Sequence, residues 1–147
     1  MDTSPGDSAN GERIFWRSCG GCHRVNGRGG HLGPDLSRIG SSRTRAAITR
    51  EIRNASAAIV PGYQAVTVVT SDGLRIRGAR KSEDAFSIQI MDSRERLQGF
   101  LKANLREVVN DSRSLMPDFG VDRLSDRDLG DLLHYLGTLR GSDPVRP

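Results

Sequence analysis

The two cysteines of the chain lie three positions apart, and a histidine follows the second: Cys19-Gly20-Gly21-Cys22-His23. Two cysteines cannot build the disulfide-dense scaffold that stabilises many small secreted domains. A structural zinc site needs about four ligands, usually as two pairs, and the sequence has no second cysteine pair and no suitably spaced histidine pair. A redox-active Cys-x-x-Cys belongs to a βαβ context, whereas a helical pattern precedes this one. The motif therefore indicates a different chemistry.

Cys-x-x-Cys-His is the attachment sequence of a c-type haem. Two thiols at this spacing can reach the two vinyl groups of one porphyrin and form thioethers, and the next residue, His23, can then ligate the iron from one side. The other nitrogen of that imidazole needs an acceptor that fixes the ring plane and the tautomer. We therefore predict one covalent haem c held by Cys19, Cys22 and His23.

A six-coordinate iron needs a second axial ligand, and the candidates are Met1, Met91, Met116, His31 and His134. We favour Met116, which lies in an irregular segment where Pro117 fixes the next φ angle. His/Met ligation also raises the potential into a range suited to electron transfer. His134 is expected on the polar side of a helix and His31 in a solvated loop, and His31 is the next candidate.

Length and composition agree with a soluble globular chain. With 147 residues, of which 35% are hydrophobic and 17 are glycine, the chain forms one domain or a small domain with an insertion. No stretch approaches the roughly 18–20 apolar residues that cross a bilayer. The polar residues 1–7 are expected to be loose and to follow a leader that has been removed.

The net charge of +4 comes from 22 basic residues, 20 of them arginine, against 18 acidic ones. The basic N-terminal part could steer an acidic redox partner to the protein. Nucleic-acid binding is not predicted, because the cations do not cluster with stacking aromatic residues or form a known module. Four arginines near the motif are candidates for pairing with the haem propionates: Arg24, Arg28, Arg38 and Arg43.

Three segments have the apolar period of amphipathic helices. The first covers about residues 8–19, with Ser8 or Asn10 as its cap. The second covers about residues 44–54. The last begins after Ser125, where an aspartate three positions later resembles a capping box, and leucines form its apolar stripe.

Residues 62–110 change from a helical to a strand period. Apolar and polar residues alternate around Ile76 and around Ile88, and Asp72-Gly73 between two such runs predicts a tight hairpin turn. We expect an antiparallel meander of about three to five strands.

Taken together, these motifs resemble the class I cytochromes c. The matching features, in chain order, are Gly11 and Phe15, Cys19-Gly20-Gly21-Cys22-His23, Gly33-Pro34-Asp35-Leu36, Met116-Pro117, and Leu132 with Tyr135. The resemblance covers residues 8–61 and 111–140. It implies crossed first and last helices, a hydrogen bond from His23 to the Pro34 carbonyl, and Met116 as the distal ligand.

Residues 62–110 depart from a plain class I domain. With them, the chain resembles the haem-binding domains at the ends of large proteins in planctomycete-, verrucomicrobium- and acidobacterium-type bacteria, which implies a module of a longer electron-transfer protein. The expected fold is mainly α, a cytochrome c-like helical fold around one haem. It is expected to be a single domain over 1–147, with the meander inserted between the second helix and the Met-ligand loop.

The predicted function is electron transfer without catalysis of its own, because a Met116 ligand leaves no open iron position for a substrate. Two alternatives are a haem enzyme or gas sensor with a displaceable sixth ligand, and a module that docks a partner through residues 62–110. The resemblance also implies redox partner proteins and an extracytoplasmic location, since c-type attachment occurs outside the cytoplasm in this family.

Overall fold

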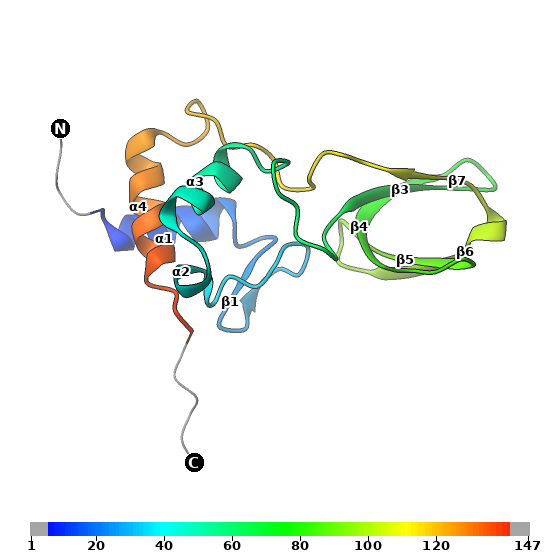
Figure 1. The fold of residues 1–147 in the computed structure, drawn as a ribbon, viewed down its shortest axis with the longest axis horizontal. Coiled ribbons are helices and arrows are strands. Elements are labelled where there is room, and N and C mark those ends of the chain that lie inside the picture. The colour runs from blue at the N-terminus through cyan, green and yellow to red at the C-terminus, as the bar shows by residue number, and fades with distance from the viewer. Residues whose placement is uncertain (1–5, 142–147) are drawn as a thin grey trace, which may run out of the picture. The chain divides into compact units, whose positions relative to one another are not determined.

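The computed structural model describes residues 6–141. The chain divides into two compact units (Figure 1). The first, here called the helical unit, comprises residues 1–54 and 118–147, and the second, the sheet unit, comprises residues 55–117. The expected single domain over residues 1–147 stays a prediction.

The described part of the helical unit, residues 6–54 and 118–141, contains four helices and a two-stranded ribbon. Their bounds are α1 (Ser8–Ser18), β1 (Arg24–Val25), β2 (Arg28–Gly29), α2 (Ile39–Ser42), α3 (Arg45–Arg53) and α4 (Asp126–Gly137). Thr44 and Ser125 cap α3 and α4 through their side-chain oxygens. The cap of α1 is Asp7, not the predicted Ser8 or Asn10. The backbone of Asp7 is extended, and its carboxylate accepts hydrogen bonds from the N–H groups of Ala9 and Asn10.

Helices α1 and α4 pack against each other, as the resemblance implies. The backbones approach so closely at Gly11 that a Cβ there would lie 2.1 Å from the Asp131 carbonyl oxygen. Phe15 is fully buried, and its ring centroid lies 5.8 Å from that of Tyr135. Asp131 accepts hydrogen bonds from the Asp7 N–H and the Asn10 amide, both at 2.8 Å. The crossing thus combines apolar packing with hydrogen bonds between Asp131 and the start of α1.

The sheet unit is one antiparallel sheet with the strand order β6-β5-β4-β3-β7. Its strands are β3 (Ala65–Thr70), β4 (Arg75–Glu83), β5 (Ser87–Asp92), β6 (Leu97–Leu101) and β7 (Leu105–Asn110). They lie within the segment predicted to form the meander. The first part of β4 pairs with β3 and its later part with β5 (Figure 1).

This sheet coils strongly on itself. Its two edge strands, β6 and β7, are joined only by the short 3-10 helix Lys102–Asn104, so the edges lie close together at that end. The coiled sheet encloses an apolar cluster made of Val66, Val68, Ile88 and Ile90. The unit thus has a hydrophobic core of its own.

Two hairpin turns explain the order of the strands. In the predicted Asp72-Gly73 turn, Gly73 takes a φ of +87°, which glycine adopts without strain. In the turn from β5 to β6, the buried Asp92 carboxylate accepts the N–H groups of Arg94 and Arg96 and the amide of Gln98. The Asp92 carboxylate therefore adds to the two backbone bonds of this turn, Asp92 N–H to the Arg96 carbonyl and Glu95 N–H to the Asp92 carbonyl.

The prediction of a mainly α fold is wrong. Helices make up 29% and strands 26% of the described residues 6–141, and the five-stranded sheet is a major element rather than a small addition. The motifs that resemble class I cytochromes c lie on or near the helices, and they dominated the prediction. The insertion, however, forms a regular sheet along most of its length.

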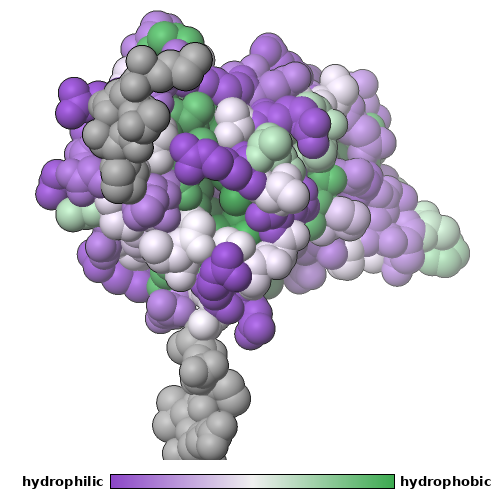
Figure 2. Space-filling model, turned by 60° about the vertical axis from the view of Figure 1, so that its left-hand side comes forward, coloured by the Kyte–Doolittle hydropathy of each residue, from purple (hydrophilic) through white to green (hydrophobic). Residues whose placement is uncertain are grey.

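No helix among residues 6–141 is long and apolar enough to span a membrane. Figure 2 shows a face on which hydrophilic side chains predominate and hydrophobic ones lie between them in recesses. This agrees with the mean hydropathy of −0.49.

Candidate functional site

The Cys-x-x-Cys-His motif forms one tight turn at the C-terminal end of α1. The N–H groups of Cys19 and Gly20 both donate to the Phe15 carbonyl, at 2.7 and 2.8 Å. The N–H groups of Cys22 and His23 then both donate to the Cys19 carbonyl, at 3.1 and 3.0 Å. Because the helix end anchors this turn, the two cysteines and the histidine are held together locally.

The two thiols of the motif differ in their exposure. Cys19 is half-buried and Cys22 is exposed, and no disulfide joins them. Burial, with a smaller effect of Cys22, raises the pKa of the Cys19 thiol to about 11. A thiol-exchange catalyst needs the opposite, a lowered thiol pKa. The electrostatics of the pair therefore argue against a thioredoxin-type redox role.

His23 is oriented by a backbone carbonyl eleven residues further along the chain. Its Nδ1 lies 2.8 Å from the carbonyl oxygen of Pro34. Because a carbonyl can only accept, Nδ1 carries the proton and Nε2 keeps its lone pair. Burial chiefly lowers the pKa of His23, the Pro34 bond opposes this, and the charge of Arg24 adds to the lowering. The imidazole is thus neutral at neutral pH, as a metal ligand must be.

Two glycines let the backbone approach His23. A Cβ on Gly33 would lie 2.6 Å from Cε1 of the imidazole. A Cβ on Gly29, whose φ is +117°, would lie 2.1 Å from the His23 carbonyl oxygen. The Gly33 contact packs the loop against the ring, and the Gly29 contact packs it against the His23 backbone. The sequence analysis identified the Gly33-Pro34 segment but not this steric role.

Trp16 supports the motif from within α1, which the sequence analysis missed. A Cβ on Gly20 would lie 2.4 Å from the Trp16 ring, and the Arg28 guanidinium lies 4.2 Å from the centroid of the indole ring. Trp16 Nε1 is buried and has no hydrogen-bond partner within residues 6–141. An aromatic residue three positions before a Cys-x-x-Cys motif could have indicated such packing.

The residues present fit a covalent haem better than a bare metal ion. In the part of the chain that the structure describes, no cluster of three or more His, Cys, Asp or Glu side chains could hold a metal. One neutral imidazole with a fixed tautomer and two adjacent thiols are the donor set that haem c requires.

A family model described as cytochrome c matches residues 8–140. The chain belongs to the cytochrome c family. Its cofactor is a covalently bound haem c, with Cys19 and Cys22 at the attachment spacing, and its function is haem-based electron transport. Among curated proteins, none matches the chain. The match shows membership of the cytochrome c family in general and does not support the narrower planctomycete-type resemblance.

The proposed distal ligand of the cytochrome lies at the end of the sheet unit. Met116 is half-buried, and its N–H donates to Ser114 Oγ at 3.1 Å. Its pairing with His23 stays a prediction. Of the other candidates, Met91 is half-buried in β5, His31 and His134 are exposed, and Met1 lies outside the described residues.

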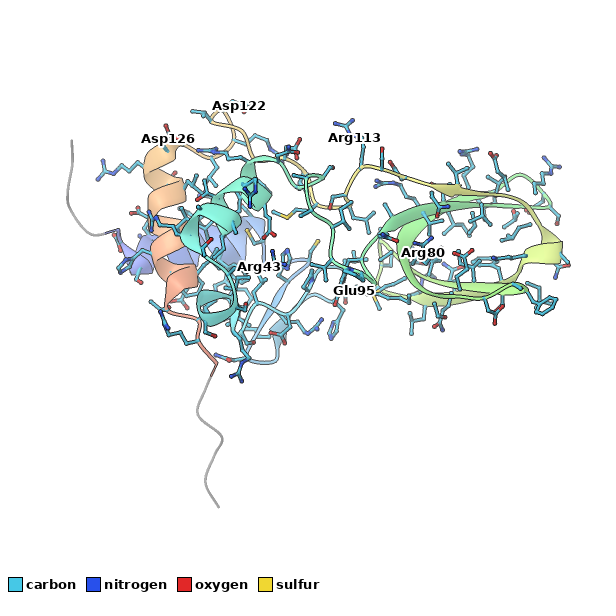
Figure 3. The ribbon with its side chains drawn as sticks, in the orientation of Figure 1. Arg43, Arg80, Glu95, Arg113, Asp122 and Asp126 are labelled. Carbon is cyan, nitrogen blue, oxygen red and sulfur yellow. The ribbon has the colours of Figure 1, made fainter. Side chains whose placement is uncertain are left out.

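The four arginines proposed for the haem propionates lie in different surroundings in this cytochrome. Arg24 contacts the loop around His23, and Arg28 stacks on Trp16. Arg38 lies against the backbone at Gly141, and Arg43, labelled in Figure 3, forms an ion pair with Glu51. Their roles toward the propionates stay predictions.

Proposed function

We propose that this cytochrome transfers single electrons through a haem c whose iron is ligated by His23 and Met116. The observation that carries the proposal is the 2.8 Å contact between His23 Nδ1 and the Pro34 carbonyl, which leaves Nε2 as the ligating atom. When bound, the haem supplies one Fe(III)/Fe(II) couple.

The chain's own residues hold and tune that couple. Cys19 and Cys22 tether the group, and the Pro34 carbonyl keeps the His23 ring in one orientation and increases its basicity. Met116 closes the sixth position, so no site is left for a substrate. We propose that the protein acts as an electron carrier, or as one module of a larger oxidoreductase, in an extracytoplasmic compartment with redox proteins as partners.

Carbon monoxide binding to the reduced protein tests the ligand assignment. We expect wild-type protein and the control Met91→Ala to bind none, because their iron is six-coordinate. Met116→Ala should bind carbon monoxide and have a lower potential. Ready binding by the wild type would support an enzyme or gas sensor instead. An unchanged spectrum and potential in Met116→Ala would exclude Met116 and make His31 the next candidate.

A second role, docking of a redox partner protein by the sheet unit, is favoured by exposed apolar side chains at its turns. Phe86 is 79% exposed and Leu101 59%, and both lie at the same end of the β5–β6 pair, where Leu101 pairs with Ser87 and the Lys102 N–H donates to the Phe86 carbonyl. In a docking role, Phe86→Ser with Leu101→Ser would slow electron exchange with a reducing partner protein without changing the potential. An unchanged rate would exclude docking at these residues.

A further inference from the structure

Arg24 places a cation directly beside the axial histidine. It follows His23 in the chain, and its side chain is only 21% exposed. Its Nη1 donates to the Gly30 carbonyl at 3.2 Å, and its own carbonyl accepts the Leu36 N–H at 2.8 Å. The guanidinium is thus fixed within the loop that runs from His23 to Pro34.

One carboxylate partly balances this cation. Asp35 Oδ2 lies 3.8 Å from Arg24 Nε, which is an ion pair too long for a hydrogen bond. The Asp35 side chain is 48% exposed, and its other oxygen accepts the Ser37 N–H at 2.8 Å. Because the anion faces water and the cation is largely buried, solvent screens Asp35 more than it screens Arg24.

We propose that the charge of Arg24 raises the reduction potential of the iron, and that Asp35 partly offsets it. This inference rests on the proposed function. The step is the reduction of Fe(III) to Fe(II) by one electron from an external reductant, with no bond formed or broken in the chain. The oxidised state carries one more positive charge, so a fixed cation beside its ligand disfavours that state.

Arg24 could instead act by position alone, because its hydrogen bond to the Gly30 carbonyl holds the loop next to His23 in place. A charge effect and a positional effect predict different results for two variants. Arg24→Lys keeps the charge but not the guanidinium geometry, and Asp35→Asn removes the anion but leaves Arg24 in place. A charge effect requires that Lys preserves the potential and that Asn raises it.

The experiment is a spectroelectrochemical titration of haem-loaded wild type, Arg24→Gln, Arg24→Lys and Asp35→Asn. The control is Arg127→Gln, an exposed arginine in the first turn of α4. At the wild-type midpoint potential, the ratio of reduced to oxidised protein should fall about two- to tenfold in Arg24→Gln, the scale of one partly screened charge. The ratio should stay within about twofold of the wild type in Arg24→Lys, rise in Asp35→Asn, and be unchanged in the control.

Three results would overturn the inference: an unchanged ratio in Arg24→Gln, an equal fall in Arg24→Lys, or a fall in Asp35→Asn. Far-UV circular dichroism checks that each variant is folded. If Arg24→Gln does not fold, Asp35→Asn and Arg24→Lys still decide the sign. A wild type without a reversible one-electron couple would instead refute the proposed function, so the two failures are distinguishable.

Discussion

Replacing Gly11 by alanine tests whether the contact between α1 and α4 holds the helical unit together. A Cβ at this position would lie 2.1 Å from the Asp131 carbonyl oxygen, 2.6 Å from the Asp131 carbonyl carbon and 2.8 Å from Tyr135 Cβ. Two of these atoms belong to the backbone of α4, so no side-chain rotation relieves the clash. The helices must therefore move apart.

The expected cost follows from what that movement disturbs. Overpacking a tight contact costs about 1–3 kcal/mol. Separation also strains the two hydrogen bonds that Asp131 accepts from the start of α1, each contributing about 1 kcal/mol. Alanine in a helix returns about 0.5–1 kcal/mol relative to glycine. We expect Gly11→Ala to lower the free energy of unfolding by about 2–3 kcal/mol.

Urea unfolding of the haem-loaded protein, followed by far-UV circular dichroism, measures this change. The matched control is Gly130→Ala in the interior of α4, where the nearest atom to an added Cβ is 3.9 Å away. The control should gain about 0.5–1 kcal/mol, because only helix propensity changes. If Gly11→Ala is as stable as the wild type, the two helices do not pack as described.

Three further predictions follow from single residues. Arg53 donates three hydrogen bonds that join α3 to residues 119–126, one of them to Asp126 (Figure 3). In urea unfolding, Arg53→Ala should therefore lower the free energy of unfolding by about 2–4 kcal/mol, and a decrease below about 0.5 kcal/mol would contradict this. Gly33→Ala should change the haem spectrum, because the added Cβ would lie 2.6 Å from the axial imidazole. The control Gly21→Ala should leave the spectrum unchanged, because no atom lies within 4 Å of its added Cβ, and equal spectra for the two variants would contradict the packing at Gly33. The pKa of the Asp92 carboxyl is lowered in the folded protein, chiefly by the Arg96 backbone N–H that it accepts. The ionised carboxylate therefore stabilises the fold at pH values above the ordinary aspartate pKa near 4, and this stabilisation is lost as the pH falls through the lower pKa of the folded state. The difference in urea midpoint between wild type and Asp92→Asn should shrink on acidification, and a constant difference would contradict this.

Local chemistry made the haem site predictable from the sequence. The Cys-x-x-Cys-His spacing is short, and five residues define the attachment turn without help from the rest of the fold. The acceptor of His23 is only eleven positions away, in a segment marked by Gly33-Pro34. The cap Ser125 could also be predicted, because an N-cap depends on residues within one turn.

The remaining features depend on contacts that distant parts of the chain make. The coiling of the sheet follows from the pairing of β7 with β3 and from a three-residue connection between opposite edges, and neither has a local signature. The mainly α prediction was wrong for a different reason, since alternation predicted the strands of residues 62–110 but they were treated as an addition to a helical fold. The proposed second ligand, Met116, lies 93 positions after His23, and no local pattern joins the two residues.

Every role assigned to this cytochrome depends on the covalent attachment of one haem at Cys19 and Cys22. The direct measurement is mass spectrometry under denaturing conditions on protein matured in a bacterial periplasm with the c-type attachment machinery. We predict a single species with the mass of the chain plus one haem, and Cys19→Ala with Cys22→Ala should give the chain mass alone. A wild-type chain that loses all its haem on denaturation, or a double variant that retains it, would contradict the account.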